Sequence, residues 1–381
     1  MKKVFSQLSI AISFTVAQSF FNIQGLGEPV YSATARTSAL GKPVAISPGN
    51  PGNFIHLSKT SIEMTLGGIW TIGQQANLTR GVPYIRPLTL YGAVPLPSRT
   101  RVLLGIDEIF NQDFDVWSES LSEIAIPRHH IQSRGGIYSL NAGVAQSFLS
   151  HFCTGVLLRV HLGGTREKWH YVIPEGTVAT DTIAIDYSAF TTRVGAAVQF
   201  TPVTFTASYD LPFHLTGRRW KLIHGRTPDS FRTYQIELPS ILNLGADIGP
   251  FWENVSFALG LELRPWTHAK INNITAGYRS ILRPSLGIEY EILPNHLLRL
   301  GYSTADWYCL IATTKKPIKE NAFHLGTGIP IPKFGTIDLA GEVIFRKGQT
   351  LSGWLKETAG RIILTLSYQE TWAKRSRHWG Y

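Results

Sequence analysis

Few residues in this chain have the types and spacing that would support covalent chemistry. Gly-Tyr-Ser-Thr-Ala at residues 301–305 approaches the Gly-x-Ser-x-Gly turn that exposes a nucleophilic serine, and a hydrolase would need a histidine facing the same way as Ser303. The pattern lies in a strand-like run with no helix signal after it, which favours a structural serine. A lipid-acting enzyme that uses Ser303 remains one hypothesis.

Metal chemistry has equally little support. His129 with His130, and His151 with Cys153, offer ligand atoms, but adjacent histidines in a polar loop are usually only solvated. The chain has no His-Glu-x-x-His, no Walker loop and no dinucleotide glycine fingerprint. We therefore expect no catalytic residues, no metal and no cofactor, and a protein that is not an enzyme.

The composition of the elements that must carry these residues points to strands. The 381 residues are 44% hydrophobic and 16% charged, which excludes intrinsic disorder, and two cysteines are too few for a disulfide scaffold. After the first two dozen positions the chain lacks any apolar run of about 20 residues, so helical membrane spans are not expected. A glycine- and aromatic-rich chain with little charge favours β-structure.

The start of the chain has the outline of a secretory signal peptide, over residues 1–19. Lys2 and Lys3 precede an uncharged stretch of apolar and small residues at 4–16, and Ala-Gln-Ser follows at 17–19. The alternative is a short buried helix. Without these residues, 34 Lys and Arg (36 minus 2) face 26 Asp and Glu, so the exported chain carries about +8. Export permits disulfides, but Cys153 and Cys309 lie in separate apolar runs, which favours unpaired buried thiols and leaves their pairing open.

Strict alternation of apolar with small or polar residues recurs along the exported chain. In residues 255–263, Val, Phe and Leu occupy one face, while Ser, Ala, Gly and Glu262 occupy the other. Turn-forming residues separate the alternating runs. This pattern predicts about 14 strands, at 62–72, 87–94, 101–108, 136–146, 153–163, 191–200, 203–210, 232–248 (with a bend at Pro239), 255–264, 284–292, 297–305, 322–330, 336–345 and 361–368.

A transmembrane barrel explains this pattern better than a soluble exported β-protein, which is the main alternative. The polar face of a soluble sandwich carries charge freely, whereas here it is mostly Gly, Ser, Ala and Thr. An unpaired strand edge in hydrocarbon would be costly, so the sheet should close. We predict an all-β fold, a transmembrane antiparallel β-barrel over residues 61–369, followed by a basic and aromatic tail at 370–381. Aromatic residues near strand ends are expected to form an interface girdle: Trp70, Tyr91, Trp169, Trp252, Trp266, Tyr290, Tyr302, Trp354 and Trp372.

Charged residues of both signs fall on the polar face of the predicted strands and should point into the lumen. They are Arg159, Glu262, Glu289, Arg299, Asp338, Glu342 and Arg361. Buried charges are costly unless paired, so these groups should pair with each other or with a plug. Lumen packing is the favoured interpretation. The alternative is that they hold a plug that a ligand displaces.

The segment before the first strand carries a family resemblance. Gly41, Ala45 and the Asn50-Pro51 pair resemble the N-terminal hatch of the outer-membrane long-chain fatty-acid transporter (FadL-like) superfamily, which includes the type IX secretion barrel shuttles. The chain departs from that pattern at Lys42, Pro43 and Gly52. The resemblance implies a hatch or plug at residues 20–60; a disordered leader is the alternative. An Asn-Pro pair favours an extended residue followed by a turn, which suits a segment folding back into a lumen.

The same resemblance implies the function. It predicts a bacterial outer-membrane barrel that binds or passes a hydrophobic or amphipathic small molecule, by capture in an apolar groove, rearrangement of the hatch and exit through a lateral or lumenal opening. The alternative is a barrel adaptor that binds a secretion or envelope protein partner. Basic groups in the expected loops, such as Arg218, Arg219 and Lys221, suit outer-membrane lipid, and the aromatic C-terminus loosely resembles the signal read by the barrel-assembly machinery. Nucleic acid is not an expected partner.

Overall fold

The computed structural model describes residues 25–31, 34–55, 57–74, 84–118, 128–172, 178–222, 232–252, 254–294, 296–311, 314–332, 335–350 and 353–370. The expected signal peptide and residues 371–381 lie outside these ranges. Strands dominate the described part of the chain, as the alternating pattern predicts. Among the described residues, no helix has the length and apolar character needed to cross a membrane.

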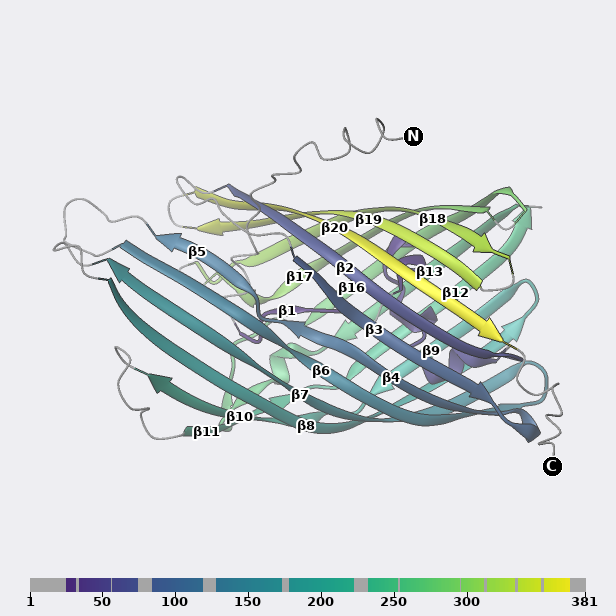
Figure 1. Cartoon of the computed structure of the whole chain (residues 1–381), viewed down its shortest axis with the longest axis horizontal. Helices are drawn as coiled ribbons and strands as arrows, with labels where there is room; N and C mark the ends of the chain where they lie inside the picture. The colour runs from purple at the N-terminus through teal and green to yellow at the C-terminus, as the bar shows by residue number, and fades with distance from the viewer. Residues whose placement is uncertain are drawn as a thin grey trace, which may run out of the picture.

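The strands follow one another around a single antiparallel sheet (Figure 1). Its strands are β1 (Glu28–Pro29), β2 (Thr60–Gln74), β3 (Tyr84–Pro95), β4 (Thr100–Asn111), β5 (Phe114–Ser118), β6 (Arg128–Phe148), β7 (Phe152–Val172), β8 (Val178–Phe200), β9 (Val203–Asp210), β10 (Phe213–Leu222), β11 (Arg232–Leu238), β12 (Ile241–Trp252), β13 (Val255–Arg264), β14 (Lys270–Ile271), β15 (Ile274–Thr275), β16 (Ile281–Leu293), β17 (His296–Leu310), β18 (Pro317–Ile331), β19 (Gly335–Thr350) and β20 (Gly353–Glu370). The short helices are α1 (Ala35–Ala39), η2 (Val44–Ile46), η3 (Pro51–Phe54), η4 (Pro97–Arg99) and η5 (Trp266–His268).

The sheet closes into a barrel of 14 strands. β2 pairs with β20 from Thr60 opposite Glu370 to Gln74 opposite Lys356, which joins the first long strand to the last. Three strands of the barrel are interrupted. β4 and β5 both pair with β6, and β9 and β10 both pair with β8, so each couple forms one strand. β11 and β12 form the third, because they pair with β10 and β9. The predicted bend at Pro239 is the break between β11 and β12. All 14 predicted strands are therefore confirmed.

The two ends of the barrel differ. Short connections such as 149–151 and 201–202 gather at one end, here named the turn end, and the opposite end is named the loop end. Most predicted strands continue beyond their expected bounds toward the loop end; for example, β7 runs to Val172 where the alternation predicts 163. Arg218, Arg219 and Lys221 consequently lie on β10 and not in a loop, and His129 with His130 lie on β6.

The barrel turns its apolar face outward and its small and polar face inward. On β16, Leu282, Leu286 and Ile288 are exposed, whereas Arg283 and Ser285 between them are buried. Such an apolar exterior around a polar interior is the arrangement of transmembrane barrels. The expected aromatic girdle is only partly correct. Tyr290, Tyr302 and Trp354 are exposed, but Tyr91 and Trp266 are buried inside the barrel.

One ladder in the wall is interrupted. β3 pairs with β4 from Pro95 opposite Arg101 as far as Thr89 opposite Asp107, although β4 continues to Asn111. The short strand β1 pairs with this free edge of β4. Arg86 of β3 forms an ion pair with Glu108 of β4 just beyond the last paired residues. Within the described residues, this part of the wall is thus joined by side chains and by the N-terminal chain.

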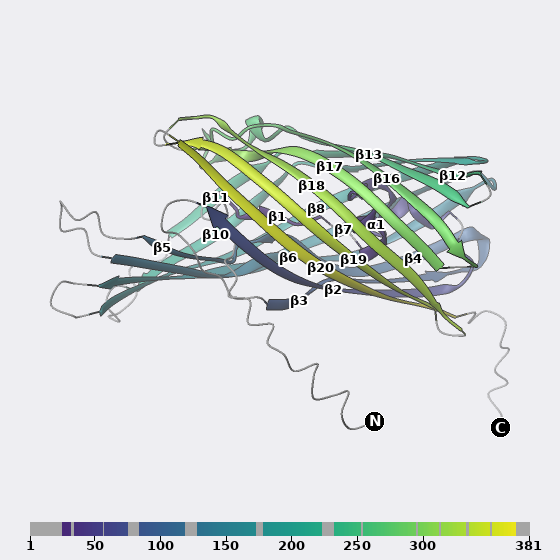
Figure 2. The same cartoon turned by 90° about the horizontal axis from the view of Figure 1, so that it is seen from above.

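The described residues between 25 and 55, here named the N-terminal segment, lie inside the barrel. Figures 1 and 2, which view the molecule from two directions at right angles, show its purple ribbon surrounded by strands, with α1 toward the turn end. α1 contacts β17, β18, β19 and β20, and η3 contacts β6, β7, β8 and β9. Thr34 caps α1 by accepting a hydrogen bond from the backbone N–H of Thr37.

Candidate functional site

The N-terminal segment is seated on inward-facing glycines of the wall. Gly287 is the cross-strand partner of Gly301, and Gly245 that of Gly260. A Cβ atom at Gly301 would lie 2.3 Å from the backbone nitrogen of Gly41, so only glycine permits this approach. The glycines whose added Cβ would meet residues 39–51 are here named the glycine track: Gly155, Gly195, Gly245, Gly260, Gly287, Gly301 and Gly326.

The four residues that carry the family resemblance lie together on this track. Gly41 has φ +86°, a left-handed conformation that favours glycine, and Ala45 is fully buried. Asn50 donates from Nδ2 to the carbonyl oxygen of Ala45 at 2.7 Å, and its Oδ1 accepts from the N–H of Gly52 at 3.0 Å. Pro51 packs against two track glycines. The resemblance residues thus form the turns that keep the segment against the wall.

Arg159 belongs to a buried network in the wall of β4, β7, β8 and β9. Its guanidinium group lies 3.0 Å from Asp107 and 3.2 Å from Asp210. Arg193 binds the same Asp210 carboxylate through two nitrogens, at 2.6 and 2.7 Å, and donates to the carbonyl oxygen of Gly49 at 2.9 Å. The network therefore reaches the N-terminal segment. Sequence reasoning selected Arg159 but missed the other three side chains.

Arg299, Glu289 and Asp338 form a second group near α1. Nitrogens of Arg299 lie 2.5 Å from each of the two carboxylates. Arg36 of the N-terminal segment adds contacts of 3.3 Å to Glu289 and to Asp247. The three predicted residues Glu289, Arg299 and Asp338 therefore form ion pairs with one another. Arg36 links α1 to the same group by charge.

Glu342 and Arg361 belong to a third group, which holds two charged residues of the N-terminal segment. Lys42 lies 2.7 Å from Glu342, and Arg361 lies 3.8 Å from the same carboxylate. Glu28 accepts from both Arg361 and Arg346. Burial alone would raise the pKa of the Glu28 carboxyl, but Arg346 and Arg361 outweigh it and hold that pKa at about 2.

Arg346 is the centre of this third group, and sequence reasoning missed it. It also lies 2.7 Å from Glu320 and 2.7 Å from Glu357, and it is fully buried. Arg346 has the same strand parity as Asp338 and Glu342, so the alternation would have found it if the strand had been extended past residue 345.

Glu262 binds two arginines beside an aromatic ring of the N-terminal segment. Arg264 lies 2.6 Å and Arg283 3.2 Å from its carboxylate. The guanidinium carbon of Arg283 is 3.3 Å from the centroid of the Tyr31 ring, and that of Arg264 is 4.9 Å away. Burial raises the pKa of Tyr31 to about 12, so its hydroxyl is neutral.

Ser303 has a histidine neighbour that the sequence did not reveal. Its hydroxyl lies 3.0 Å from Nε2 of His324 on the next strand, and Nδ1 of His324 is 3.7 Å from Glu342. The order resembles that of a hydrolase triad, but Glu342 is bound to Lys42, and all three side chains are buried. In this arrangement a substrate has no access to the Ser303 hydroxyl.

The histidines and cysteines that the sequence offered as possible metal ligands are not gathered into a site among the described residues. His130 binds Asp115 at 2.8 Å and stacks on His170, while the side chain of His129 lies outside the described residues. Cys153 and Cys309 are free and buried, and His151 is exposed. Among the residues that the structure describes, no group of three or more His, Cys, Asp or Glu side chains is placed to hold a metal.

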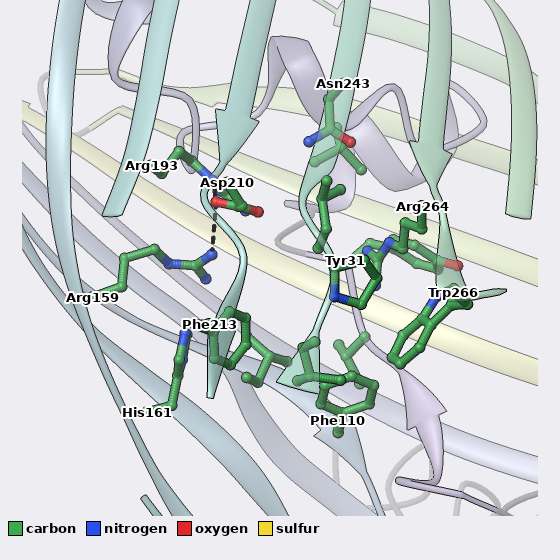
Figure 3. Close-up of a pocket in the computed structure, with 16 residues that line it drawn as sticks. Tyr31, Phe110, Arg159, His161, Arg193, Asp210, Phe213, Asn243, Arg264 and Trp266 are labelled. Carbon is green, nitrogen blue, oxygen red and sulfur yellow. Dashed lines mark hydrogen bonds and ion pairs between the residues drawn. The ribbon is translucent and has the colours of Figure 1, made fainter. Parts of the chain in front are cut away.

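Cavities adjoin the N-terminal segment at several places, and the smallest of those named here, about 20 Å³, is lined by Tyr31, Lys42 and Arg361 among others. The loop-end cavity measures about 270 Å³ and is lined by Leu26, Phe114, Tyr187, Tyr234 and Tyr278 among others. The central cavity measures about 50 Å³ and lies around Tyr31 (Figure 3). One buried apolar cluster contributes lining residues to both the loop-end and the central cavity. Its members include Leu26, Phe110, Tyr187, Ile236, Leu238, Trp266 and Tyr308.

The barrel is antiparallel, with an apolar exterior and a charged interior. These are the features of transmembrane β-barrels. Solved structures of the same fold include the toluene transporter TbuX of Ralstonia pickettii, with 14% identity, a TM-score of 0.65, and coverage of 89% of this chain and 98% of that chain. The toluene transporter TodX of Pseudomonas putida matches with 15% identity, a TM-score of 0.64, and coverage of 90% and 99%. A Pseudomonas aeruginosa FadL homologue matches with 13% identity, a TM-score of 0.64, and coverage of 89% and 99%.

At these identities the likeness shows the fold, and the expected resemblance to FadL-type barrels is confirmed at that level. No protein-family model matches the sequence. No curated protein matches it either.

Proposed function

We propose that this chain is an outer-membrane channel that passes hydrophobic small molecules and that its N-terminal segment is the plug. The observation that carries the proposal is the loop-end cavity, which ends at the N-terminal segment and whose aliphatic and aromatic lining also contains the polar residues Gln112, Ser133, Thr165 and Glu167. Small-molecule sites are lined mainly by apolar and aromatic side chains, and a volume of about 270 Å³ approaches the usual size for a small ligand. The apolar exterior suits a membrane, and the structural neighbours are described as transporters of toluene.

The route runs from the loop-end cavity through the apolar cluster to the central cavity. Tyr308 lies on this route and holds the N-terminal segment, because its hydroxyl accepts from the N–H of Leu26 at 2.7 Å and donates to the carbonyl oxygen of Gly27 at 2.8 Å. An exit through the wall fits the free edge of β4, where β1 of the segment takes the place of β3. Movement of β1 would then leave the ion pair of Arg86 with Glu108 beside the free edge, while β3 and β4 stay paired from Thr89 to Pro95.

The predicted charged residues serve as anchors of the plug in this proposal. Lys42, Arg36 and Glu28 of the N-terminal segment each bind charged groups of the wall. This arrangement supports the sharper of the two interpretations of the lumen charges, in which they hold a plug and do more than pack. Ion pairs of this kind satisfy the buried wall charges only while the plug is in place.

Uptake of labelled toluene into liposomes that contain the purified protein tests the function. We expect uptake faster than into empty liposomes, and a chain lacking residues 20–55 should change the rate because the plug is gone. Gly341→Leu is the matched control, since a Cβ at this glycine would meet nothing within 4 Å. Uptake equal to that of empty liposomes would contradict the channel, and an unchanged rate after the deletion would contradict the plug.

A further inference from the structure

Tyr31 lines the central cavity, and it also lines a smaller cavity of about 20 Å³ together with Lys42 and Arg361. Figure 3 shows the Tyr31 ring between Arg264 and Trp266 on one side and Asp210 on the other. The free volume of about 50 Å³ has room for a water or two, since each water takes about 30 Å³ of liquid, but it has no room for a second ring. Tyr31 borders this space, so shortening its side chain would enlarge it.

The seat of this ring is suited to an aromatic group. Arg283 lies against the ring at 3.3 Å and Arg264 lies 4.9 Å from its centroid, both within the range of cation–π attraction. Both guanidinium groups are buried and share the single carboxylate of Glu262. The central cavity beside the ring is lined in part by apolar groups of Phe110, Phe213 and Leu238. A ring that replaced Tyr31 would keep both kinds of contact.

Polar side chains with unpartnered atoms line different sides of the same cavity (Figure 3). Both ring nitrogens of His161, Oδ1 of Asn243 and Nε1 of Trp266 are buried and lack a hydrogen-bond partner among the described residues. All three side chains line the central cavity. An unpaired buried polar group costs free energy, so this cavity has donors and acceptors available for a guest.

We propose that the central cavity is a binding site for a phenol, meaning a single aromatic ring that carries a hydroxyl group, and that Tyr31 closes the site by narrowing it. A hydroxyl can donate to Asn243 Oδ1 or to the unprotonated nitrogen of His161, and it can accept from Trp266 Nε1. A hydrocarbon ring of the same size satisfies none of these atoms. The inference rests on the proposed channel function and names the ligand class of its inner site.

Binding of p-cresol and toluene to the detergent-purified protein, measured by calorimetry, tests this site. Because a ligand must first displace Tyr31, Tyr31→Ala should bind p-cresol at least about tenfold more tightly than the wild type. Tyr31→Phe should stay as weak as the wild type, because its ring still narrows the cavity. In Tyr31→Ala, p-cresol should bind at least about tenfold better than toluene, since a site with hydrogen-bonding groups rejects the analogue that lacks the hydroxyl. Phe205→Ala, which removes an exposed ring from the outer face, is the control for loss of an aromatic group.

Equal affinities of Tyr31→Ala and wild type for p-cresol would overturn the closing role of Tyr31. Equal affinities of Tyr31→Ala for p-cresol and toluene would overturn the phenol preference. Asn243→Leu in the otherwise wild-type chain keeps the test independent of the folding of Tyr31→Ala: p-cresol binding should weaken by about tenfold with toluene binding unchanged. If toluene enters the liposomes but Tyr31→Ala binds p-cresol no better than toluene, the phenol site alone is refuted. If no uptake is seen at all, the channel is refuted.

Discussion

The two parts of the N-terminal segment are held in the barrel by different physical means. Residues 39–51 lie on the glycine track, where backbone meets backbone at distances that exclude a side chain. The described residues between 25 and 36, with Lys42, are held by charge and by aromatic rings through Glu28, Tyr31 and Arg36, in addition to the pairing of β1 with β4. A steric fit depends little on pH or salt, whereas paired charges depend on both. The comparison indicates that movement should begin in the first part of the segment.

Removal of Arg346 should have the largest effect on this comparison. Arg346→Met leaves the carboxylates of Glu28, Glu320 and Glu357 without their shared partner, and breaking a buried ion pair costs about 3–5 kcal/mol. Urea unfolding of the protein in detergent measures this loss. Arg166→Met is the control, because the exposed pair of Arg166 with Asp186 should contribute less than about 1 kcal/mol. Equal losses in the two variants would contradict the importance of the charged anchor.

Filling the glycine track should displace the other part of the segment. The Cβ of Gly301→Leu would lie 2.3 Å from Gly41 N and 2.5 Å from the carbonyl oxygen of Ala39, so the segment must move away. Overpacking of this kind costs about 1–3 kcal/mol of stability. Because the displaced segment would leave more of the lumen open, we expect raised conductance in planar bilayers. Gly341→Leu should conduct like the wild type. A closed pore in Gly301→Leu would show that the track does not hold the segment.

Acid should loosen the charged part and leave the track intact. The Glu28 carboxyl has a pKa of 4.5 in an unfolded chain and about 2 in the folded protein, so its contribution is complete above pH 4.5 and is lost as the pH falls through about 2. Protease cleavage near residue 28 should therefore be as slow at pH 4.5 as at pH 7 and should accelerate only near pH 2. A proteolysis assay with an acid-stable protease measures this, and acceleration already between pH 7 and pH 5 would contradict the assigned role of Glu28.

The smallest effect is expected at the hydrogen bond between Ser303 and His324, next to Glu342 of the third charged group. Ser303→Ala removes one hydrogen bond to His324 and should cost about 1 kcal/mol in urea unfolding, with toluene uptake unchanged. The same variant addresses the enzyme hypothesis, because hydrolysis of an ester substrate by the wild type and its loss in Ser303→Ala would show that the buried serine becomes accessible.

The alternating pattern was sufficient to predict the barrel, because the apolar exterior repeats with the period of a strand. It failed toward the loop end, where strands such as β7 carry polar residues on both faces; Arg166 and Glu167 are adjacent there. The aromatic girdle was partly wrong for a related reason. Strand position alone does not say on which side of the wall a ring lies, and Tyr91 points inward to bind Asp107 at 3.0 Å.

The candidate site was predictable residue by residue but not as a set of partners. Parity placed Arg299 and Asp338 on one face, yet their contact depends on the register of β17 against β18 and β19, which the sequence does not reveal. The glycines were visible as small inward residues. Their role as a continuous seat could not be predicted, because it depends on which glycines of neighbouring strands lie at the same level.

The connection between the N-terminal segment and β2 limits how the proposed plug could leave the barrel. Residues 55–59 are the only chain between η3 and Thr60, which is paired with Glu370 at the closing seam. Five residues reach at most about 17 Å when fully extended, so the end of the segment next to β2 can move only about that far from the seam. In the proposed channel, opening would therefore move the first part of the segment, which carries Glu28 and Tyr31, while the end next to β2 stays beside the seam.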